Sequence, residues 1–426
     1  MHFQGLIGIA VLLAIALLLS TDRRRISARV VIGGMALQFI VAVLCLRFPP
    51  VVAVFDWLGR VVNRIISFAD AGTRFIFNDV SDPGGPWGFI FAVRVLPVIV
   101  FFAALMGVLY HLGIMQRVIA GVAWVLRRTL GVTGAEALSA AANIFVGQTE
   151  APLCVKPYIA GMTRSQLMAV MTGGFATIAG SVLAAYVGLL GGEDEIARTM
   201  FAKHFITASV MSAPAAFVMA KIMLPETQIP ASEALPDLVN QPRETRNVLD
   251  AAAAGATDGL KLALNVAAML IAFVALLAMI NWPIQALGEW GPIAAWREAN
   301  GVPTLSLQYL LGRLLSPLAW ALGVNPADTI VFGALMGEGV IATEFVAYAS
   351  LHRAIETDAI SQRTAVMATY TLCGFANLPS IAIQIGGLSA IAPERRADFA
   401  SLGLRAMTAG ALACWMTGAV AGMFLS

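Results

Sequence analysis

Two acidic residues, Glu150 and Glu344, lie in stretches that are otherwise apolar. An ionised carboxylate at the centre of a bilayer costs about 2.5–3.5 kcal/mol even on the scale derived from helix insertion. A segment that only has to cross a membrane gains nothing from such a residue. We therefore expect both acids to accept hydrogen bonds from a polar solute or to carry protons. The structural alternative for Glu150 is a helix cap, with Pro152 in the first turn of the helix that follows.

The composition places these acids in a membrane protein. Of 426 residues, 59% are hydrophobic and 12% are charged, whereas a soluble domain has about 45–50% apolar and about 25% charged residues. The formal charge of +2 argues neither for nor against nucleic-acid binding, and no nucleic-acid partner is expected. The glycine-containing strings do not follow a strand, as a phosphate-binding loop would, and no Ser-His-Asp set converges. The sequence therefore predicts an all-α polytopic membrane protein that is not an enzyme.

Apolar stretches long enough to cross a bilayer recur along the chain. Three arginines at 23–25 follow the first of them and are expected to be cytoplasmic by the positive-inside rule. That places both termini on the periplasmic or extracellular side of an inner (plasma) membrane. The eight expected spans are residues 4–20, 30–47, 88–113, 166–190, 204–224, 261–282, 365–386 and 402–425.

Two polar-centred stretches between these spans are too short to cross. Gly147 and Pro152 flank Glu150, and only about a dozen apolar residues lie on each side, where a span needs about 20. Two half-helices that enter and leave on the same side fit better, so re-entrant hairpins are predicted at 132–160 and 324–350. Residues 51–77 carry polar side chains at helical spacing, which predicts an amphipathic helix that lies on the membrane surface or braces subunits. A second such helix, with Arg117, Arg127 and Arg128, should end at Gly131.

The two halves of the chain repeat one plan. GGFATIAGS at 173–181 is similar to CGFANLPSI at 373–381, and Thr149-Glu150 is similar to Thr343-Glu344. Because the two GFA-containing spans run in opposite directions, the repeat is inverted, as in many secondary transporters. The predicted divisions are 1–87 (two spans and an interfacial helix, as scaffold), 88–225 (first repeat), 226–250 (cytoplasmic linker) and 251–426 (second repeat).

The polar residues near the two acids suit a neutral solute. Gln148, Asn377 and the Ser380 hydroxyl can each donate and accept hydrogen bonds. Such a set fits a solute rich in hydroxyls and ring amides, such as a nucleoside, and would reject analogues that lack those groups. Phe345 and Phe375 either form walls for a base or sugar or belong to the core.

A second group of oxygens could bind a hard cation. Asn143 and Thr177 offer side-chain oxygens, and Val146 and Ile178 lie where a helix is expected to break. Unwound backbone at the end of a half-helix supplies carbonyl oxygens for Na⁺. From spacing alone, this site remains one possibility among others.

Four strings resemble the signature stretches of the concentrative nucleoside transporters in their bacterial form: GQTEAPL, TGGFATIAGSVLAAYV, EFVAY and CGFANLPSIAIQIGG. The resemblance covers nearly the whole chain. It implies a homotrimer in a lipid bilayer, each protomer having eight transmembrane helices, two re-entrant hairpins and interfacial helices. It also implies cation-coupled uptake of nucleosides such as uridine, cytidine or adenosine, by an elevator-type movement of a hairpin-bearing domain against the scaffold.

The resemblance also assigns roles to residues. Gln148, Thr149 and Glu150 resemble the group that reads the base, and Phe375 resembles a pocket aromatic. The group that holds the ribose is represented by Glu344, Asn377 and Ser380. The sodium ligands are represented by Asn143, Val146, Thr177 and Ile178, the valine and isoleucine acting through backbone carbonyls.

Two positions depart from the family pattern. Thr343 stands where members often have Asn, which leaves the nucleoside preference open. Glu338 stands where many have Lys, and this acid either takes part in proton coupling or, as we favour, faces water. Because GQTE and Asn143 are retained, sodium is the expected coupling ion. A proton-coupled symporter is the alternative, and a nucleoside channel or sensor on the same fold is a third reading.

Overall fold

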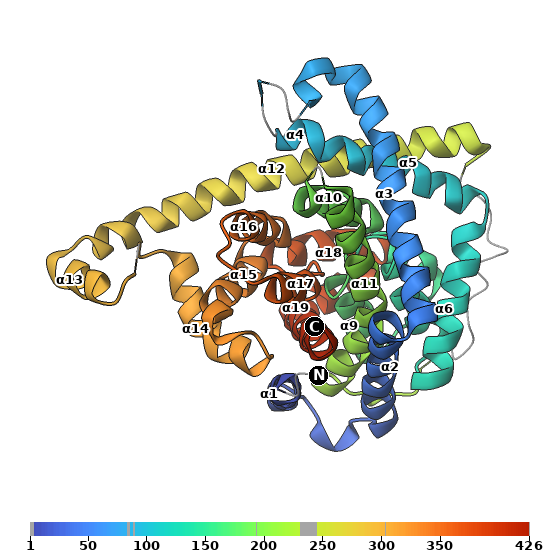
Figure 1. Cartoon of the computed structure of the whole chain (residues 1–426). Coiled ribbons are helices and arrows are strands. Elements are labelled where there is room, and N and C mark those ends of the chain that lie inside the picture. Colours follow the sequence, from blue (N-terminus) through green and yellow to red (C-terminus); the bar gives the residue numbers. More distant parts are fainter. Residues whose placement is uncertain are drawn as a thin grey trace.

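The computed structural model describes residues 4–82, 86–87, 90–192, 194–230, 245–302 and 304–425. These residues form helices and connecting turns, and none of them lies in a strand. The all-helical prediction is therefore confirmed for the part of the chain that is described. Figure 1 shows the helices wrapped around a central group formed by α9, α11, α17 and α19.

The α-helices are α1 (Gly5–Leu18), α2 (Ala28–Arg47), α3 (Pro49–Phe77), α4 (Phe91–Arg94), α5 (Leu96–His111), α6 (Ile114–Leu130), α7 (Gly134–Asn143), α8 (Lys156–Ile159), α9 (Arg164–Phe175), α10 (Gly180–Gly191), α11 (Glu195–Met223), α12 (Val248–Gly288), α13 (Gly291–Ala299), α14 (Leu307–Ala321), α15 (Thr329–Ile341), α16 (Glu344–Glu356), α17 (Gln362–Thr371), α18 (Leu378–Ile391) and α19 (Arg396–Phe424). Short 3₁₀ helices are η1 (Arg23–Arg25), η2 (Asn78–Ser81), η3 (Ala151–Val155), η4 (Pro326–Asp328) and η5 (Pro393–Arg395).

Most of the expected spans coincide with long apolar helical segments. Among the described residues, six segments are long and apolar enough to cross a membrane: Ala28–Arg47, Phe91–His111, Arg164–Gly191, Glu195–Met223, Val248–Gly288 and Pro393–Phe424. The first and seventh expected spans coincide with the shorter apolar helices Gly5–Leu18 and Leu378–Ile391. The seventh expected span, 365–386, also includes most of α17, which ends six residues before α18 begins.

These segments divide into an inner and an outer set. The windows in Arg164–Gly191, Glu195–Met223 and Pro393–Phe424 are 89–94% buried within the protomer, whereas the window in α12 is only 11% buried. α12 runs as one long helix across the molecule beside α5 (Figure 1). Gly107 of α5 and Gly255 of α12 permit this contact, because a Cβ on either would lie within 2.7 Å of a backbone oxygen of the other helix.

The predicted linker at 226–250 is partly replaced by helix. Its residues 231–244 lie outside the described residues, and α12 already begins at Val248. Asn247 starts this helix by accepting a hydrogen bond from the amide of Asp250 at 2.9 Å. A side-chain cap of this kind satisfies an otherwise unpaired amide, so the polar character of the segment marks a helix start as well as a connection.

The predicted interfacial segment at 51–77 is a helix, α3, and it packs against the inner set. Asp56 forms an ion pair with Lys203 of α11 at 2.8 Å, and Asp70 lies 3.9 Å from Arg198. Gly59 sits against the backbone of α11, where a Cβ would approach the Thr199 carbonyl oxygen to 2.7 Å. Part of the polar face of α3 is thus used inside the protomer.

The first predicted hairpin differs from the expected pair of half-helices. α7 forms one limb, but the returning limb consists of the 3₁₀ helix η3 and the four-residue helix α8. Pro152 and Pro157 lie in the first turns of these two pieces. Since proline lacks an amide hydrogen and clashes with the preceding turn, it prevents a continuous α-helix here. The second hairpin consists of α15 and α16, with its tip at Ala342 and Thr343.

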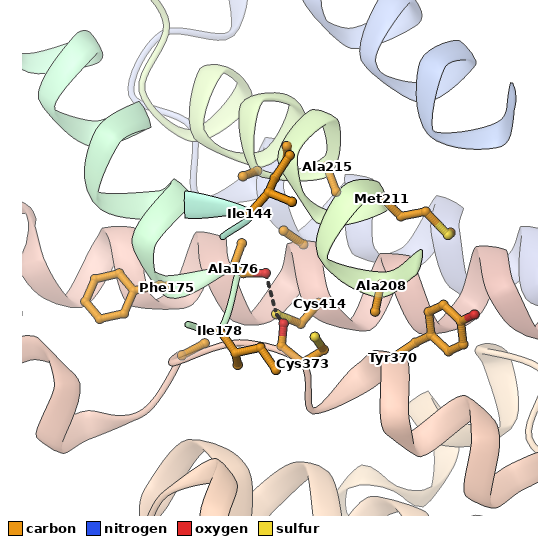
Figure 2. Close-up of a cluster of buried hydrophobic side chains, with 14 of the residues drawn as sticks. Ile144, Phe175, Ala176, Ile178, Ala208, Met211, Ala215, Tyr370, Cys373 and Cys414 are labelled. Carbon is orange, nitrogen blue, oxygen red and sulfur yellow. Dashed lines mark hydrogen bonds between the residues drawn. The ribbon is translucent and has the colours of Figure 1, made fainter. Parts of the chain in front are cut away.

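The two GFA strings coincide with helix breaks, and the breaks touch. The chain is not helical between Phe175 and Gly180 or between Thr371 and Leu378. The Phe375 amide donates to the Thr177 carbonyl oxygen at 3.3 Å. Figure 2 shows Cys414 of α19 between Ala176 and Cys373, with its thiol donating to the Ala176 carbonyl oxygen at 3.6 Å. Repeated sequence elements therefore meet at the centre of the protomer.

Candidate functional site

Glu344 is buried at the first position of α16 and accepts hydrogen bonds on both carboxylate oxygens. The Asn377 amide donates to Oε2 at 2.6 Å, and the Tyr186 hydroxyl donates to Oε1 at 2.8 Å. Glu344 is 5% exposed, and its two partners are more deeply buried. Its own backbone amide also interacts with the carboxylate, which can accept about four hydrogen bonds in all. The arrangement leaves an anchored acceptor for donors on a solute.

Two capped helix starts position this group. Thr343 caps α16 by accepting from the Val346 amide at 3.3 Å. The side-chain oxygen of Asn377, Oδ1, caps α18 by accepting from the Ser380 amide at 2.8 Å. Because the N-terminal end of a helix carries partial positive charge, both starts favour an anion, and Glu344 lies where they meet. Of the ribose group expected from the sequence, Glu344, Asn377 and Ser380 are thus brought together.

Tyr186 belongs to this group but was not among the predicted site residues. It lies in α10 within an apolar stretch and is fully buried, so its sequence context indicates only core. Its ring packs against Phe345, with ring centroids 4.6 Å apart, and Phe345 also contacts Phe91. Of the two readings of Phe345, core packing is therefore the one that the contacts favour. In the sequence, the one feature that could have identified Tyr186 as a site residue is its hydroxyl group on an otherwise apolar helix face.

The base-reading residues expected in the first hairpin lie along α18. A Cβ on Gly174 would contact both Gln148 and the Gln384 amide nitrogen, and a Cβ on Gly387 would lie 2.7 Å from the Thr149 methyl carbon. Ser380 and Gly387 are seven residues apart, or about 10 Å along a helix. Gln148 and Thr149 therefore lie next to the same helix whose start holds Asn377 and Ser380. The first and second halves contribute to one elongated region.

Two buried amide oxygens in this region lack partners. Among the described residues, no hydrogen-bond donor reaches Gln148 Oε1 or Gln384 Oε1. The Gln384 amide nitrogen is fixed by the Met171 carbonyl oxygen at 3.0 Å. Because buried acceptors without partners are unfavourable, these oxygens indicate an incomplete polar site. Gln384 is a second residue that the prediction missed, although it lies in one of the matched strings.

Glu150 and Phe375 border the region at its more open parts. Glu150 is exposed and precedes η3, but its side chain makes no capping hydrogen bond there. The capping alternative for Glu150 is therefore not supported by the contacts. Its carboxylate lies close to the Cα of Gly147, where any Cβ would collide with it. Phe375 is half-buried in the second helix break.

The proposed cation ligands gather around the first break. The Asn143 amide donates to Ser139, and a Cβ on Gly173 would lie 3.3 Å from the Asn143 amide nitrogen. The Thr177 hydroxyl donates to the carbonyl oxygen of the same Gly173 at 2.9 Å. Asn143 Oδ1 is buried and has no partner among the described residues. An orphaned buried oxygen beside a second side-chain oxygen fits a small hard cation.

The backbone positions fit the same reading. Val146 and Ile178 both lie outside helices, as expected. Their segments are joined, because the Phe145 carbonyl oxygen accepts from the Gly180 amide at 3.0 Å. The tip of the first hairpin therefore lies against the α9–α10 break, and all four predicted ligands come from these two segments.

Glu338 does not face water, contrary to the expectation favoured above. It is 4% exposed on α15 and interacts with the side chains of Gln308 on α14 and Ser350 on α16. Gln308 in turn accepts from Asn281 of α12 at 2.9 Å. The sequence alone did not distinguish a solvated acid on the hairpin from an enclosed one. Packing of α14 against the hairpin encloses it instead.

Three family models match this chain. The model for the C-terminus of Na⁺-dependent nucleoside transporters matches residues 204–422, and the model for their N-terminus matches residues 7–80. A nucleoside-recognition Gate model matches residues 92–193. All of the proposed site residues lie within the matched regions.

Individual proteins agree with the models. The chain is 44% identical to an uncharacterised transporter of Haemophilus influenzae, over 99% of this chain and 97% of that protein. It is 39% identical to mouse solute carrier family 28 member 3 over 99% of this chain, but it spans only 58% of that longer protein. A structure of CNTnw in an inward-facing substrate-bound state shares 42% identity and gives a TM-score of 0.89, covering 99% of this chain and 97% of the other.

Proposed function

The chain belongs to the family of Na⁺-dependent nucleoside transporters, also called concentrative nucleoside transporters, and from this membership we propose that it imports nucleosides by sodium symport. The observation that carries the proposal is the buried Glu344, held by Asn377 and Tyr186. A carboxylate fixed in this way is an acceptor for hydroxyl groups, as a ribose would require. The homologues are transporters and not enzymes.

The solute is proposed to lie along α18. Its ribose hydroxyls would bond to Glu344, Asn377 and Ser380, which are linked to one another. Its base would meet Gln148, Thr149 and Glu150 of the first hairpin, about 10 Å farther along the helix. Phe375 would form an apolar wall. The unpartnered Gln148 oxygen supports this assignment, because a ring amide is the kind of donor that it lacks.

Sodium is proposed to bind Asn143, Thr177 and the carbonyl oxygens of Val146 and Ile178. A cation there would join the tip of the first hairpin to the α9–α10 break. Sodium would then favour the solute-binding conformation by its higher affinity for that state, and its gradient would drive accumulation. The orphaned Asn143 oxygen supports this role.

The movement is proposed to be of the elevator type in a homotrimer with eight transmembrane helices and two re-entrant hairpins per protomer. The contrast between deeply buried inner helices and the outlying α12 supports a mobile unit carried by a separate scaffold. Both termini lie at one end, because Gly5 of α1 contacts Met423 of α19. The opposite end gathers Arg23–Arg25, Arg395 and Lys221, which supports a cytoplasmic assignment for that end.

Uptake into proteoliposomes tests the proposal. Labelled uridine should accumulate when an inward sodium gradient is imposed, and a protonophore should not prevent it. Equal uptake in sodium-free buffer that a protonophore abolishes would establish proton coupling instead, the alternative that a buried Glu338 favours. Equilibration without accumulation would indicate a channel. Competition by each natural nucleoside, with and without sodium, would define the preference that Thr343 leaves open.

A further inference from the structure

A pocket of about 600 Å³ lies where α6 ends and the first hairpin begins, away from the solute site. Its lining is basic: Arg29, Arg127 and Arg128, with Trp124 at its side. The remaining lining residues are Gly131, Val132, Thr133 and Pro230. Its volume is within the usual range for small-molecule sites, about 300–1,000 Å³. None of the lining residues that the structure describes is acidic.

The pocket has a fixed wall. The Arg29 guanidinium donates to the Arg128 carbonyl oxygen at 3.1 Å, at the end of α6. Gly131 ends this helix with a φ of +69°, and a Cβ there would lie 2.8 Å from the Arg29 guanidinium carbon. The backbone conformation therefore favours glycine here, and the Arg29 guanidinium lies against it. The C-terminal end of α6, which attracts cations, is already occupied by this arginine.

Two nearby acids, Glu136 and Glu226, share one lysine, Lys221. Glu136 follows Thr133 by one helical turn, but it pairs with Lys221 at 2.5 Å. Glu226 accepts from the Thr163 hydroxyl at 2.7 Å and lies 3.8 Å from the same lysine. Lys221 balances one of the two carboxylate charges, and the three pocket arginines outnumber the one that remains. An anion is the ligand that this electrostatic environment favours.

The outer face of α6 adds an apolar requirement. Ile114, Val118, Trp124 and Val125 are 38–60% exposed on this helix. Such a face on a basic amphipathic helix lies at the boundary between headgroups and acyl chains, and tryptophan is enriched at that level. A ligand here would meet arginines with its polar part and apolar side chains with the rest. Free phosphate satisfies only the first of these features.

We propose that this pocket binds the phosphate headgroup of an anionic phospholipid, whose acyl chains lie along the outer face of α6. The proposal does not depend on the transported solute. It agrees with the cytoplasmic orientation proposed above, because the cytoplasmic leaflet carries anionic lipids and basic pockets at this level bind their headgroups. The bound lipid would contact α2, α6 and the start of the first hairpin together.

Binding is tested on the full-length purified protein by titration with two lipids that share acyl chains, dioleoylphosphatidylglycerol and dioleoylphosphatidylcholine. Native mass spectrometry counts the bound molecules. We expect at least a tenfold preference for the anionic lipid, decreasing as salt rises. Equal affinity for the two lipids would overturn the proposal. Glycerol phosphate and inorganic phosphate serve as headgroup-only probes, and either one binding as tightly as the lipid would also overturn it.

The double substitution Arg127→Gln with Arg128→Gln removes two pocket charges while leaving the Arg29 contact to the backbone. We expect this variant to lose the tenfold preference. Arg117→Gln, on the same helix but about 15 Å away, is the matched control and should keep it. A folded double variant that still prefers the anionic lipid would contradict the proposal. If the double variant does not fold, the comparison of the two lipids on the unaltered protein still supports or overturns the proposal.

Discussion

The Asn377 side chain donates to Glu344 at 2.6 Å while its carbonyl oxygen caps α18. One amide thus links a buried acid on the second hairpin to the start of the helix that follows the second break. The position of the Glu344 carboxylate therefore depends on Asn377, which is itself fixed at the start of α18.

Glu344→Gln should reduce uridine uptake at least tenfold while the protein still assembles. The amide replaces one acceptor oxygen with a donor, which then faces the donating Tyr186 hydroxyl or Asn377 amide. The measurement is initial uptake at equal amounts of reconstituted protein. Uptake equal to that of the unaltered protein would remove Glu344 from the solute site.

Tyr186→Phe should raise the KM for nucleosides about tenfold with a smaller change in maximal rate. The phenyl ring keeps the packing against Phe345, but the hydrogen bond to Glu344 is lost, and a bond to a charged group is worth about 1.5–3 kcal/mol. Phe205→Leu is the control, because it alters aromatic packing in the same cluster and leaves the Tyr186 hydroxyl in place. Phe205→Tyr would not be a suitable control. An unchanged KM for Tyr186→Phe would show that the hydroxyl does not position Glu344.

Asn143→Ala should raise the sodium concentration that gives half-maximal uptake by about tenfold or more. The substitution removes the buried oxygen that has no partner within the described chain. Ser212→Ala is a matched control, because that buried hydroxyl bonds only to its own helix at the Ala208 carbonyl oxygen, at 2.8 Å. A sodium dependence that Asn143→Ala leaves unaltered would place the ion elsewhere.

Glu338→Gln should leave uptake within about twofold and its sodium dependence unchanged. The amide has nearly the same volume, and its oxygen can still accept from Gln308 or Ser350. Uptake is measured from pH 5.5 to 8 with sodium held constant. If the substitution abolished uptake or its pH dependence, Glu338 would be identified as the proton-carrying residue of a proton-coupled symporter.

Lys221→Met should destabilise the protein by about 3–5 kcal/mol, since it leaves Glu136 buried without its partner. Both side chains are almost fully buried, 7% and 2% exposed. Adding Glu136→Gln should recover part of the loss because the uncompensated charge is then removed. Thermal unfolding in detergent measures both. A double variant no more stable than Lys221→Met would show that the pair contributes little beyond packing.

The sequence was informative where a residue type conflicted with its surroundings. Glu150 and Glu344 were conspicuous in apolar stretches, and a helix break was correctly expected at Ile178, whereas the break at the second GFA string was not predicted. Tyr186 and Gln384 gave no such contrast, since an isolated tyrosine or glutamine on an apolar helix is compatible with ordinary packing. Their roles depend on which helix packs against each side chain, and that packing is determined by the whole fold.

The errors have local causes as well. The return limb of the first hairpin was expected to be helical, but Pro152 and Pro157 divide it into short pieces. Glu338 was expected to face water, but it is buried. Only the position of α14, more than fifteen residues earlier in the chain, determines that it is enclosed.

Thr177 takes part in both the candidate sodium site and the contact to the candidate solute pocket. Its hydroxyl is a candidate sodium ligand, while its carbonyl oxygen accepts from the amide of Phe375, a candidate wall of the solute pocket. A shift of this one residue on ion binding would therefore be transmitted to the other repeat through a single hydrogen bond. Linkage requires that such an effect be reciprocal. Nucleoside must therefore raise the affinity for sodium by the same factor by which sodium raises the affinity for nucleoside. Binding titrations of each ligand, with the other absent or at saturation, can compare these two factors.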